Sequence, residues 1–151
     1  MSISIGKSPR LAVRGILIHQ DRLLLVNAWA NHKSSLWCAP GGGVECGQSL
    51  PNNLEREVKE ETGLTVQVGT PCLVNEFHDP KSQFHQVEVF FRCRLISGHL
   101  DSEWIDPQGV VSKRQWFTRE ETEMANIKPS SLPKIAWAGD FGYDPLELIV
   151  F

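Results

Sequence analysis

Four glutamates, Glu55, Glu57, Glu60 and Glu61, fall within seven consecutive residues of this chain. If the segment is helical, Glu57, Glu60 and Glu61 stand at positions i, i+3 and i+4, so their carboxylates project from one face. Like charges at this spacing repel one another by roughly 0.2–0.5 kcal/mol per pair, and a bound cation would offset that repulsion. Clustered carboxylate oxygens suit Mg²⁺ or Mn²⁺. A solvated acidic helix without a ligand is the alternative interpretation.

The glycines of the preceding PGGG segment strengthen the first interpretation. Gly41 and Gly42 give the backbone the freedom to bring its amide groups close to a bound ligand. A glycine loop packed beside a carboxylate cluster predicts a site for a diphosphate group held through a cation.

Local signals predict the helix that carries the glutamates. Ser49 is a favourable N-cap, Pro51 is tolerated in a first turn, and Gly63 is a typical residue just after a helix. The sequence therefore predicts a helix over residues 50–62. Its Leu54 would face the core.

The rest of the chain alternates strand and turn signals. LAVRGILIHQDRLLLVN predicts two strands joined by a short turn, whereas WANHKSSLW predicts a loop. LTVQVGTPCLVNEF and FHQVEVFFRCRLI predict two long strands separated by a turn at HDPKSQ. We expect an extended loop at GHLDSEWIDPQGVVSKR, a short strand at QWF, a helix capped by Thr118 and Glu121, and a last helix in SSLPKIAWAG.

Composition limits the class of protein. With 151 residues and 41% hydrophobic content, the chain is expected to form a single α/β domain over residues 1–151, with a mixed sheet. No apolar run approaches the length of about 20 residues that a membrane helix needs, and the start lacks a secretory signal, so we expect a soluble, cytoplasmic protein. The net charge of −3 has no Lys/Arg block, which argues against long nucleic acid as a partner. The four cysteines show no CxxC pair and are expected to be reduced thiols.

The stretch from Gly42 to Leu64 resembles the Nudix box, the signature of the Nudix hydrolases, written G-x5-E-x7-R-E-U-x-E-E-x-G-U with U a bulky aliphatic residue. Eight of the nine specified positions match, and the exception is Gln48, which stands where the pattern has Glu. The strand order and the QWF strand before TREE are also similar to the family, so the resemblance extends to most of the chain. It implies a Nudix-type α/β/α sandwich with a mixed sheet.

The resemblance also implies roles for the box residues. Glu57, Glu60 and Glu61 would be ligands of Mg²⁺ or Mn²⁺, and Glu57 or a carboxylate from a later loop would help to deprotonate the attacking water. Arg56 would orient this set, and we place Arg56, Glu57 and Glu60 in the catalytic group. The implied reaction is hydrolysis of a nucleoside diphosphate linked to a further group.

Gln48 is the point at which activity is open to question. Gln retains an acceptor oxygen, but it cannot compensate a cation or form an ion pair with Arg56. The first interpretation is a working enzyme with weaker metal affinity, because the loss of an outer partner usually reduces metal function without abolishing it. The second is a non-catalytic module that senses a nucleotide or binds a partner.

Residues outside the box are candidates for a fourth metal ligand and for substrate contacts. Asp101, Glu103 and Asp106 lie in a suitable loop, and we select Glu103 as the metal ligand. Trp29 and Trp104 lie among polar residues and are candidates for base stacking. A surface acid is the alternative for each carboxylate, and Glu45 is a further nearby acid.

The substrate suggested by similarity in LAVRGILI, LWCAPGGGVECGQSL and HQVEVFF is ADP-ribose or another nucleotide sugar. Nucleoside triphosphates, including damaged ones in a house-cleaning role, are the alternative. Family members often form dimers, and the apolar end PLELIVF can pack at such an interface, so a homodimer is one expected assembly.

Overall fold

The computed structural model describes residues 7–30 and 34–151 of the chain. The bounds of its elements are β1 Arg10–His19, β2 Arg22–Asn27, β3 Trp37–Cys38, β4 Gly41–Gly43, α1 Leu50–Thr62, β5 Thr65–Asp79, β6 Phe84–Ser97, β7 Arg114–Thr118, α2 Arg119–Met124, α3 Leu132–Ala138, β8 Gly142–Tyr143 and β9 Glu147–Leu148. Of the WANHKSSLW segment predicted as a loop, residues 31–33 lie outside the described part, and Trp37 begins β3.

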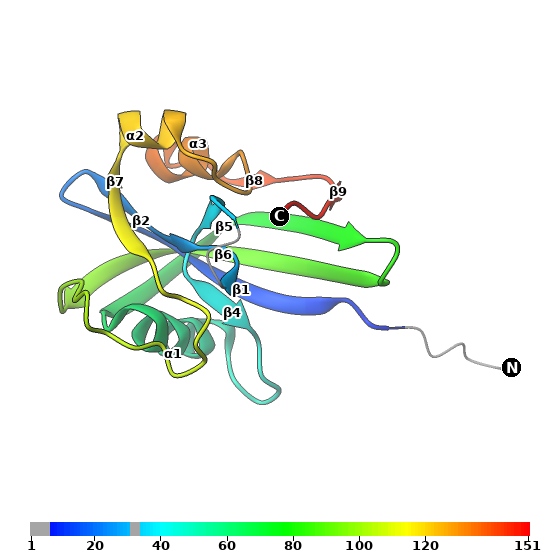
Figure 1. Cartoon of the computed structure of the whole chain (residues 1–151), viewed down its shortest axis with the longest axis horizontal. Helices are drawn as coiled ribbons and strands as arrows, with labels where there is room; N and C mark the ends of the chain where they lie inside the picture. Colours follow the sequence, from blue (N-terminus) through cyan, green and yellow to red (C-terminus); the bar gives the residue numbers. More distant parts are fainter. Residues whose placement is uncertain (1–6, 31–33) are drawn as a thin grey trace, which may run out of the picture.

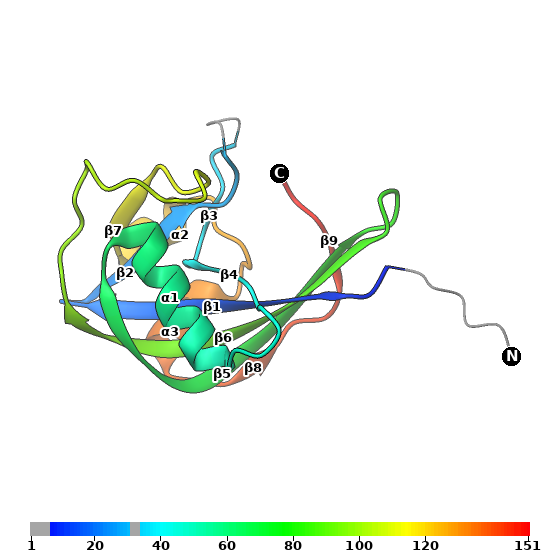
Figure 2. The same ribbon diagram turned by 90° about the horizontal axis from the view of Figure 1, so that it is seen from below.

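The strands form one mixed sheet in the order β3-β2-β1-β6-β5-β8, with β4 on β1, β7 on β2 and β9 on β5. The central pair β1 and β6 is parallel, while β1 with β2 and β5 with β6 are antiparallel. Helix α1 covers one side of this sheet, and α2 and α3 cover the other (Figures 1 and 2). The predicted α/β sandwich with a mixed sheet is confirmed.

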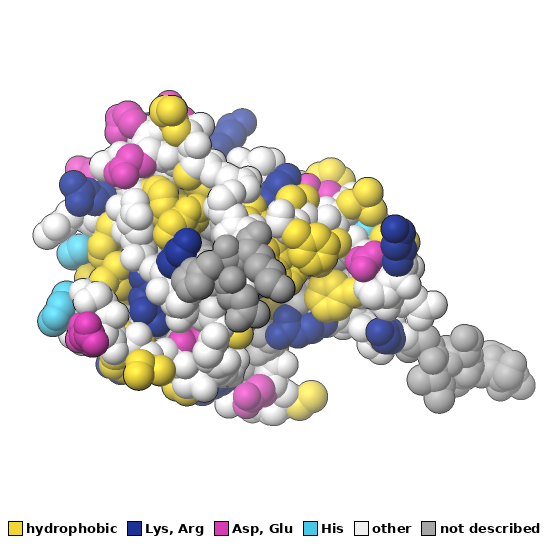
Figure 3. Space-filling view, in the orientation of Figure 1, with side chains coloured by type: hydrophobic (Ala, Val, Ile, Leu, Met, Phe, Trp, Pro, Cys, Tyr) yellow, Lys and Arg dark blue, Asp and Glu magenta, His cyan; other side chains and the backbone are white. Residues whose placement is uncertain are grey.

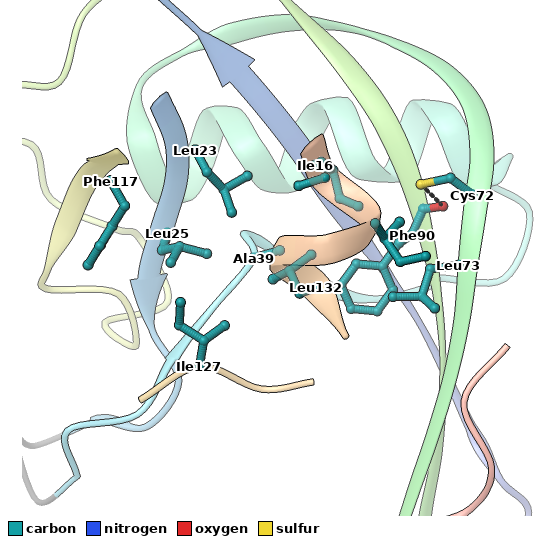
Figure 4. Close-up of a cluster of buried hydrophobic side chains, with 12 residues drawn as sticks. Ile16, Leu23, Leu25, Ala39, Cys72, Leu73, Phe90, Phe117, Ile127 and Leu132 are labelled. Atoms are coloured by element: carbon teal, nitrogen blue, oxygen red, sulfur yellow. Dashed lines mark hydrogen bonds between the residues drawn. The ribbon is translucent and has the colours of Figure 1, made fainter. Parts of the chain in front are cut away.

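Two hydrophobic clusters hold the layers together. On the side of α1, Leu54 and Val58 pack against Val13 and Leu17 of β1. On the opposite side, Leu132 of α3 packs in the cluster that contains Phe90, as Figure 4 shows. Each face of the central strands is therefore buried, which explains why their sequences read as long apolar runs.

The helix α1 begins and ends where its capping residues predict. The hydroxyl of Ser49 accepts a hydrogen bond from the Asn52 N–H at 3.2 Å, and Gly63 adopts a left-handed conformation with φ of 77°. The predicted bounds 50–62 are confirmed, as are the two long strands, the short strand at QWF and the capping box of Thr118 and Glu121.

The glycine segment differs from the predicted loop, because Gly41–Gly43 forms the short strand β4 on β1. A Cβ added to Gly41 would lie 1.9 Å from the carbonyl oxygen of Val13, so only glycine permits this approach. The glycines thus let the backbone of β4 pair with β1. This segment therefore has a fixed position and is not a flexible loop.

Other properties of the chain follow from the same coordinates. Cys38, Cys46, Cys72 and Cys93 are free thiols, as predicted. Within the ranges that the structure describes, no helix is long and apolar enough to cross a membrane.

Asn53 connects α1 to the glycine strand. Its side chain is fully buried, accepts a hydrogen bond from the Glu45 N–H at 3.0 Å and donates one to the Gly43 carbonyl at 3.1 Å. These two bonds fix the loop between β4 and α1 at the entrance to the helix.

We expect Asn53→Ala to lower the free energy of unfolding by about 1–3 kcal/mol, because the Glu45 N–H and the Gly43 carbonyl lose their partner. Urea unfolding measures this difference. The neighbouring and exposed Asn52 provides the control, since Asn52→Ala is expected to change the free energy by less than about 0.5 kcal/mol. Equal losses for the two variants would contradict this role of Asn53.

Candidate active site

The glutamates of α1 separate into two groups in the structure. Glu57 and Glu61, four residues apart on the helix, are 5% and 7% exposed. Both line a cavity between α1, β4 and the loop that precedes β7. Glu60 is not among the described residues that line it, and its carboxylate accepts two hydrogen bonds from Arg56 Nη1, each at 3.2 Å.

We call this space the acidic cavity. Its lining includes Glu57, Glu61, Asp106, the strand Gly41–Gly43, Arg10 and Arg14.

Glu61 is the most strongly perturbed acid of the site. Burial raises the pKa of its carboxyl to about 8, although the nearby Arg14 and a hydrogen bond from the Gly41 N–H at 3.1 Å both act in the opposite direction. The protein therefore holds a carboxyl out of water at the glycine strand, where added positive charge would stabilise its ionised form.

Glu57 packs directly against the glycine strand. A Cβ added to Gly42 would lie 2.7 Å from Glu57 Oε2, so the glycine makes room for the carboxylate. Burial raises the pKa of Glu57, and the guanidinium of Arg56, whose Nη1 lies 3.4 Å from Glu57 Oε1, opposes that rise. The predicted placement of a glycine segment beside a box carboxylate is present in this contact.

Arg56 lies at the centre of a polar cluster on the outer side of α1. Besides Glu57 and Glu60, it contacts Glu45 Oε1 at 3.5 Å and donates from Nε to Gln48 Oε1 at 3.4 Å. Gln48 is exposed and donates to Glu45 Oε2 at 3.3 Å. The departure from the family pattern therefore lies at the rim, with Arg56 between it and Glu57.

The loop carboxylate in the cavity is Asp106 and not Glu103. Glu103 is exposed and lies in a turn with Asp101. It is not among the described residues that line the acidic cavity. Asp106 is 5% exposed, and its carboxylate accepts the backbone N–H groups of Gln108, Val110 and Val111. The structure therefore favours Asp106 over the predicted Glu103 as the loop carboxylate of the cavity, and the sequence had no means of ordering three acids in one irregular loop.

The donor atoms suit a hard divalent cation. Glu57, Glu61 and Asp106 present only oxygen, and positive charge among them would lower the raised pKa of both glutamates. Over residues 7–30 and 34–151, no three His, Cys, Asp or Glu side chains are close enough to hold a metal ion unaided. A cation here would complete its shell with water and with substrate oxygens, as Mg²⁺ usually does.

Two arginines of β1 line the acidic cavity, and neither was predicted as a site residue from the sequence. Arg14 Nε donates to Glu88 Oε2 at 2.6 Å, and its Nη1 donates to the Ala39 carbonyl at 3.2 Å. Arg10 donates to Gln86, which in turn donates to Glu88 Oε2 at 3.1 Å. The arginine inside the apolar run LAVRGILI was a signal that could have identified Arg14, whereas Arg10 precedes that run.

A second space, which we call the apolar cavity, adjoins the first and shares Arg10, Arg14, Ala28 and Cys38 with it. Its walls include Trp29, Leu36, Phe77, Phe84, Leu148 and Val150. Figure 3 shows hydrophobic side chains gathered near the position at which Figure 1 marks the C-terminus.

The two candidate tryptophans have different surroundings. Trp29 lines the apolar cavity, stacks on Phe151 with ring centroids 4.9 Å apart, and donates from Nε1 to the Val150 carbonyl at 3.1 Å. Trp104 lies instead against Gly63 at the end of α1 and donates from Nε1 to the Glu60 carbonyl at 2.8 Å. Trp104 therefore packs at the end of α1, and it is not among the described residues that line either cavity.

A mixed sheet between helices, with buried glutamates of α1 facing a glycine strand, defines a Nudix-type domain. The chain belongs to this family: the family model described as the NUDIX domain matches residues 8–138.

Individual relatives agree with that assignment. The ADP-ribose pyrophosphatase of Methanocaldococcus jannaschii is 34% identical over 92 residues, covering 61% of this chain and 54% of that protein. Diphosphoinositol polyphosphate phosphohydrolase 3-alpha of Mus musculus is 30% identical over 102 residues, covering 68% of this chain and 58% of its own length. The chain thus spans about half the length of these curated relatives.

The fold is similar to that of solved Nudix structures. A NUDIX hydrolase from Nitrosomonas europaea matches with a TM-score of 0.70 at 20% identity, over 89% of this chain and 93% of that one. At this identity the likeness extends to the fold.

We expect Gln48→Glu to lower the Mg²⁺ concentration needed for half-maximal thermal stabilisation, because it adds negative charge beside Arg56 at the rim of the acidic cavity. Its effect on the free energy of unfolding is expected to stay within about 0.5 kcal/mol, since the residue is exposed. Thermal unfolding during a Mg²⁺ titration measures both. Gln115→Glu, a matched change at an exposed glutamine of β7, should leave the Mg²⁺ dependence unaltered. A higher Mg²⁺ requirement for Gln48→Glu would contradict this account.

Proposed function

We propose that the protein is a Mg²⁺-dependent pyrophosphohydrolase that cleaves a nucleoside diphosphate linked to another group. The observation that carries this proposal is the adjoining pair of cavities, which share Arg10 and Arg14. One cavity offers carboxylates and cationic groups for a diphosphate, and the other offers aromatic and aliphatic walls for an attached ring. A substrate with both parts would span the junction.

The proposed metal ligands are Glu57 and Glu61, and Asp106 lines the same cavity. Glu60 is paired with Arg56 instead. Mg²⁺ or Mn²⁺, when bound, would offset charge on the diphosphate and lower the pKa of a water molecule. Arg56 fixes the direction of the Glu57 carboxylate through their contact at 3.4 Å.

Glu57 is the proposed acceptor of the proton of the attacking water. Burial alone raises the pKa of Glu57, and a cation in the acidic cavity would favour its ionised form, which is the form that can accept a proton. The packing of Gly42 against its carboxylate limits the positions that the proton acceptor can take.

Arg10 and Arg14 are proposed to orient the diphosphate at the junction of the cavities. Each uses part of its guanidinium for Gln86 or Glu88, and a guanidinium carries five N–H donors, so further donors are available for phosphate oxygens. The Glu88 carboxylate fixes the orientation of Arg14 and offsets its charge at 2.6 Å.

ADP-ribose, or another nucleotide sugar, is the substrate class that we propose to test first. The relative from Methanocaldococcus jannaschii is named an ADP-ribose pyrophosphatase, and the apolar cavity supplies walls for a base or sugar. Free cysteines support a reducing compartment, so the cytoplasm is the proposed location. A homodimer through the apolar C-terminal end is a further proposal, to be tested by light scattering.

Incubation with ADP-ribose and Mg²⁺ is expected to release AMP and a sugar phosphate, because attack would occur within the diphosphate. Chromatography of the products measures this outcome. Nucleoside triphosphates in the same panel would release pyrophosphate. Faster turnover of a triphosphate than of ADP-ribose would indicate that nucleoside triphosphates are the substrate class. Binding of nucleotides without turnover of any panel member, with Mg²⁺ or Mn²⁺, would favour a non-catalytic module.

We expect Glu57→Gln and Glu61→Gln each to lower kcat by at least about a hundredfold, because each removes a charged oxygen ligand at the buried end of the acidic cavity. Steady-state kinetics at saturating Mg²⁺ measures the loss. Glu120→Gln on exposed α2 is the matched control and should retain the wild-type kcat. Rates within about twofold of wild type for both cavity variants would remove these glutamates from the proposed site.

A further inference from the structure

One carboxylate in the wall of the apolar cavity has no described partner. Glu147 of β9 lines this cavity and is half-buried, so a ligand held there can reach its oxygens. None of the ion pairs among the described residues involves Glu147, and no described donor reaches its carboxylate. An ionised carboxylate only accepts hydrogen bonds, and its two oxygens can accept two donors side by side. The cavity wall therefore presents an accessible pair of acceptors.

The second carboxylate of the cavity lining is already occupied. Glu88 accepts hydrogen bonds from Arg14 at 2.6 Å and from Gln86 at 3.1 Å. Gln86 in turn accepts a hydrogen bond from Arg10. Of the two carboxylates described in this lining, Glu147 is thus the one that is left to accept donors from a ligand.

Lys128, the lysine of the cavity lining, belongs to a different side of the cavity. Its backbone N–H donates to the Trp37 carbonyl of the edge strand β3 at 3.1 Å, whereas β9 pairs with β5 toward the other edge of the sheet. A lysine ammonium only donates hydrogen bonds, so it would contact acceptors on a ligand. Lys128 and Glu147 would therefore contact different groups of a bound molecule.

The register of the sheet places Glu147 in line with Arg10. Arg10 of β1 lies opposite Gln86 of β6, which lies opposite Phe77 of β5. Phe77 in turn lies opposite Glu147 of β9, and all four residues line the apolar cavity. Neighbouring strands are about 4.8 Å apart, so the Cα atoms at the two ends of this row are roughly 14 Å apart. A group attached to a diphosphate at Arg10 would lie along the row.

We propose that Glu147 is a specificity-determining residue that accepts hydrogen bonds from the cis-diol of a sugar attached to the diphosphate. The two adjacent hydroxyl groups of ribose supply two donors, which match the two oxygens of one carboxylate. Acidic side chains bind ribose hydroxyl groups in this way in dinucleotide-binding folds. Phe77, which lies between Arg10 and Glu147 in the row, offers an apolar surface to the ring of the sugar. This inference rests on the proposed function and deepens it, since it selects ribose over deoxyribose.

The segment that carries Glu147 is fixed on both sides of this residue. The Asp144 N–H donates to the Val74 carbonyl and the Ile149 N–H donates to the His78 carbonyl, each at 2.9 Å. The carboxylate is therefore carried by a backbone that is hydrogen-bonded to β5. Because β9 follows residue 138, where the match to the family model ends, this contact is separate from the glutamates of α1.

The test compares ribose ligands with deoxyribose ligands by calorimetry at saturating Mg²⁺. AMP is compared with 2′-deoxy-AMP, and ribose 5-phosphate with 2-deoxyribose 5-phosphate. None of these monophosphates contains a phosphoanhydride bond that could be cleaved during the measurement. We expect the ribose member of at least one pair to bind roughly tenfold or more tightly, because the deoxy ligand leaves a charged acceptor without its donor. The pair that shows the preference identifies the sugar that Glu147 contacts.

Glu147→Leu is expected to reduce this ratio to near one, and Glu147→Gln is expected to lower it, because the neutral amide has one acceptor oxygen in place of two. Glu120→Leu, a matched change at an exposed glutamate of α2, should keep the wild-type ratio. Equal affinities within both pairs for the wild-type protein would overturn the inference. A preference that survives unchanged in the Glu147 variants would overturn it as well.

The outcomes for the sugar and for the reaction can be told apart. Cleavage of ADP-ribose together with equal binding of ribose and deoxyribose ligands would overturn the inference and leave the proposed function standing. A preference for ribose that Glu147→Leu abolishes, in a protein that cleaves no diphosphate, would support the inference and contradict the proposed function.

Discussion

The burial of two carboxylates against a glycine strand is the constraint on which the rest of the site depends. Glu57 and Glu61 are removed from water by the close approach of β4 to β1 and α1, and burial raises the pKa of both. That approach exists because Gly41 and Gly42 leave space that a Cβ would fill with clashes. Asn53 then holds the connecting loop to the helix. Removing charged groups from water is costly, so a bound cation would stabilise the ionised form of both carboxylates.

The parallel pairing of β1 with β6 supplies the positive charge on the opposite wall. It places Arg14 beside Glu88, 74 residues away in the sequence, and the same pairing sets Arg10 beside Gln86. The carboxylate of Glu88 fixes Arg14 between the two cavities, where a flexible surface arginine would lose more conformational freedom on binding. The fold thus provides a fixed cationic boundary between an acidic and an apolar space, which is the arrangement that the proposed cleavage of a nucleoside diphosphate requires.

Local signals in the sequence predicted the helix, the long strands and the caps, because each depends on residues close in the chain. The spacing of the glutamates also predicted that α1 would carry the site. It could not predict that Glu60 would turn toward Arg56, since a helical face is wide enough for carboxylates to take different partners. The choice of Asp106 over Glu103 depends on the path of an irregular loop, and the packing of Trp104 on Gly63 depends on how that loop crosses the helix end. The pairing of Arg14 with Glu88 needed the register of β1 with β6.

The structure separates what the family shares from what distinguishes this chain. Gln48, the one mismatch in the box, lies at the exposed rim and still accepts a hydrogen bond from Arg56, so the buried end of the acidic cavity keeps its glutamates. The apolar cavity is closed in part by Leu148 and Val150, which follow the region matched by the family model. Trp29 contacts the same terminal segment through its stack on Phe151. Changes in this segment can therefore alter the group that is bound without moving the carboxylates, which would let substrate choice vary independently of the proposed chemistry.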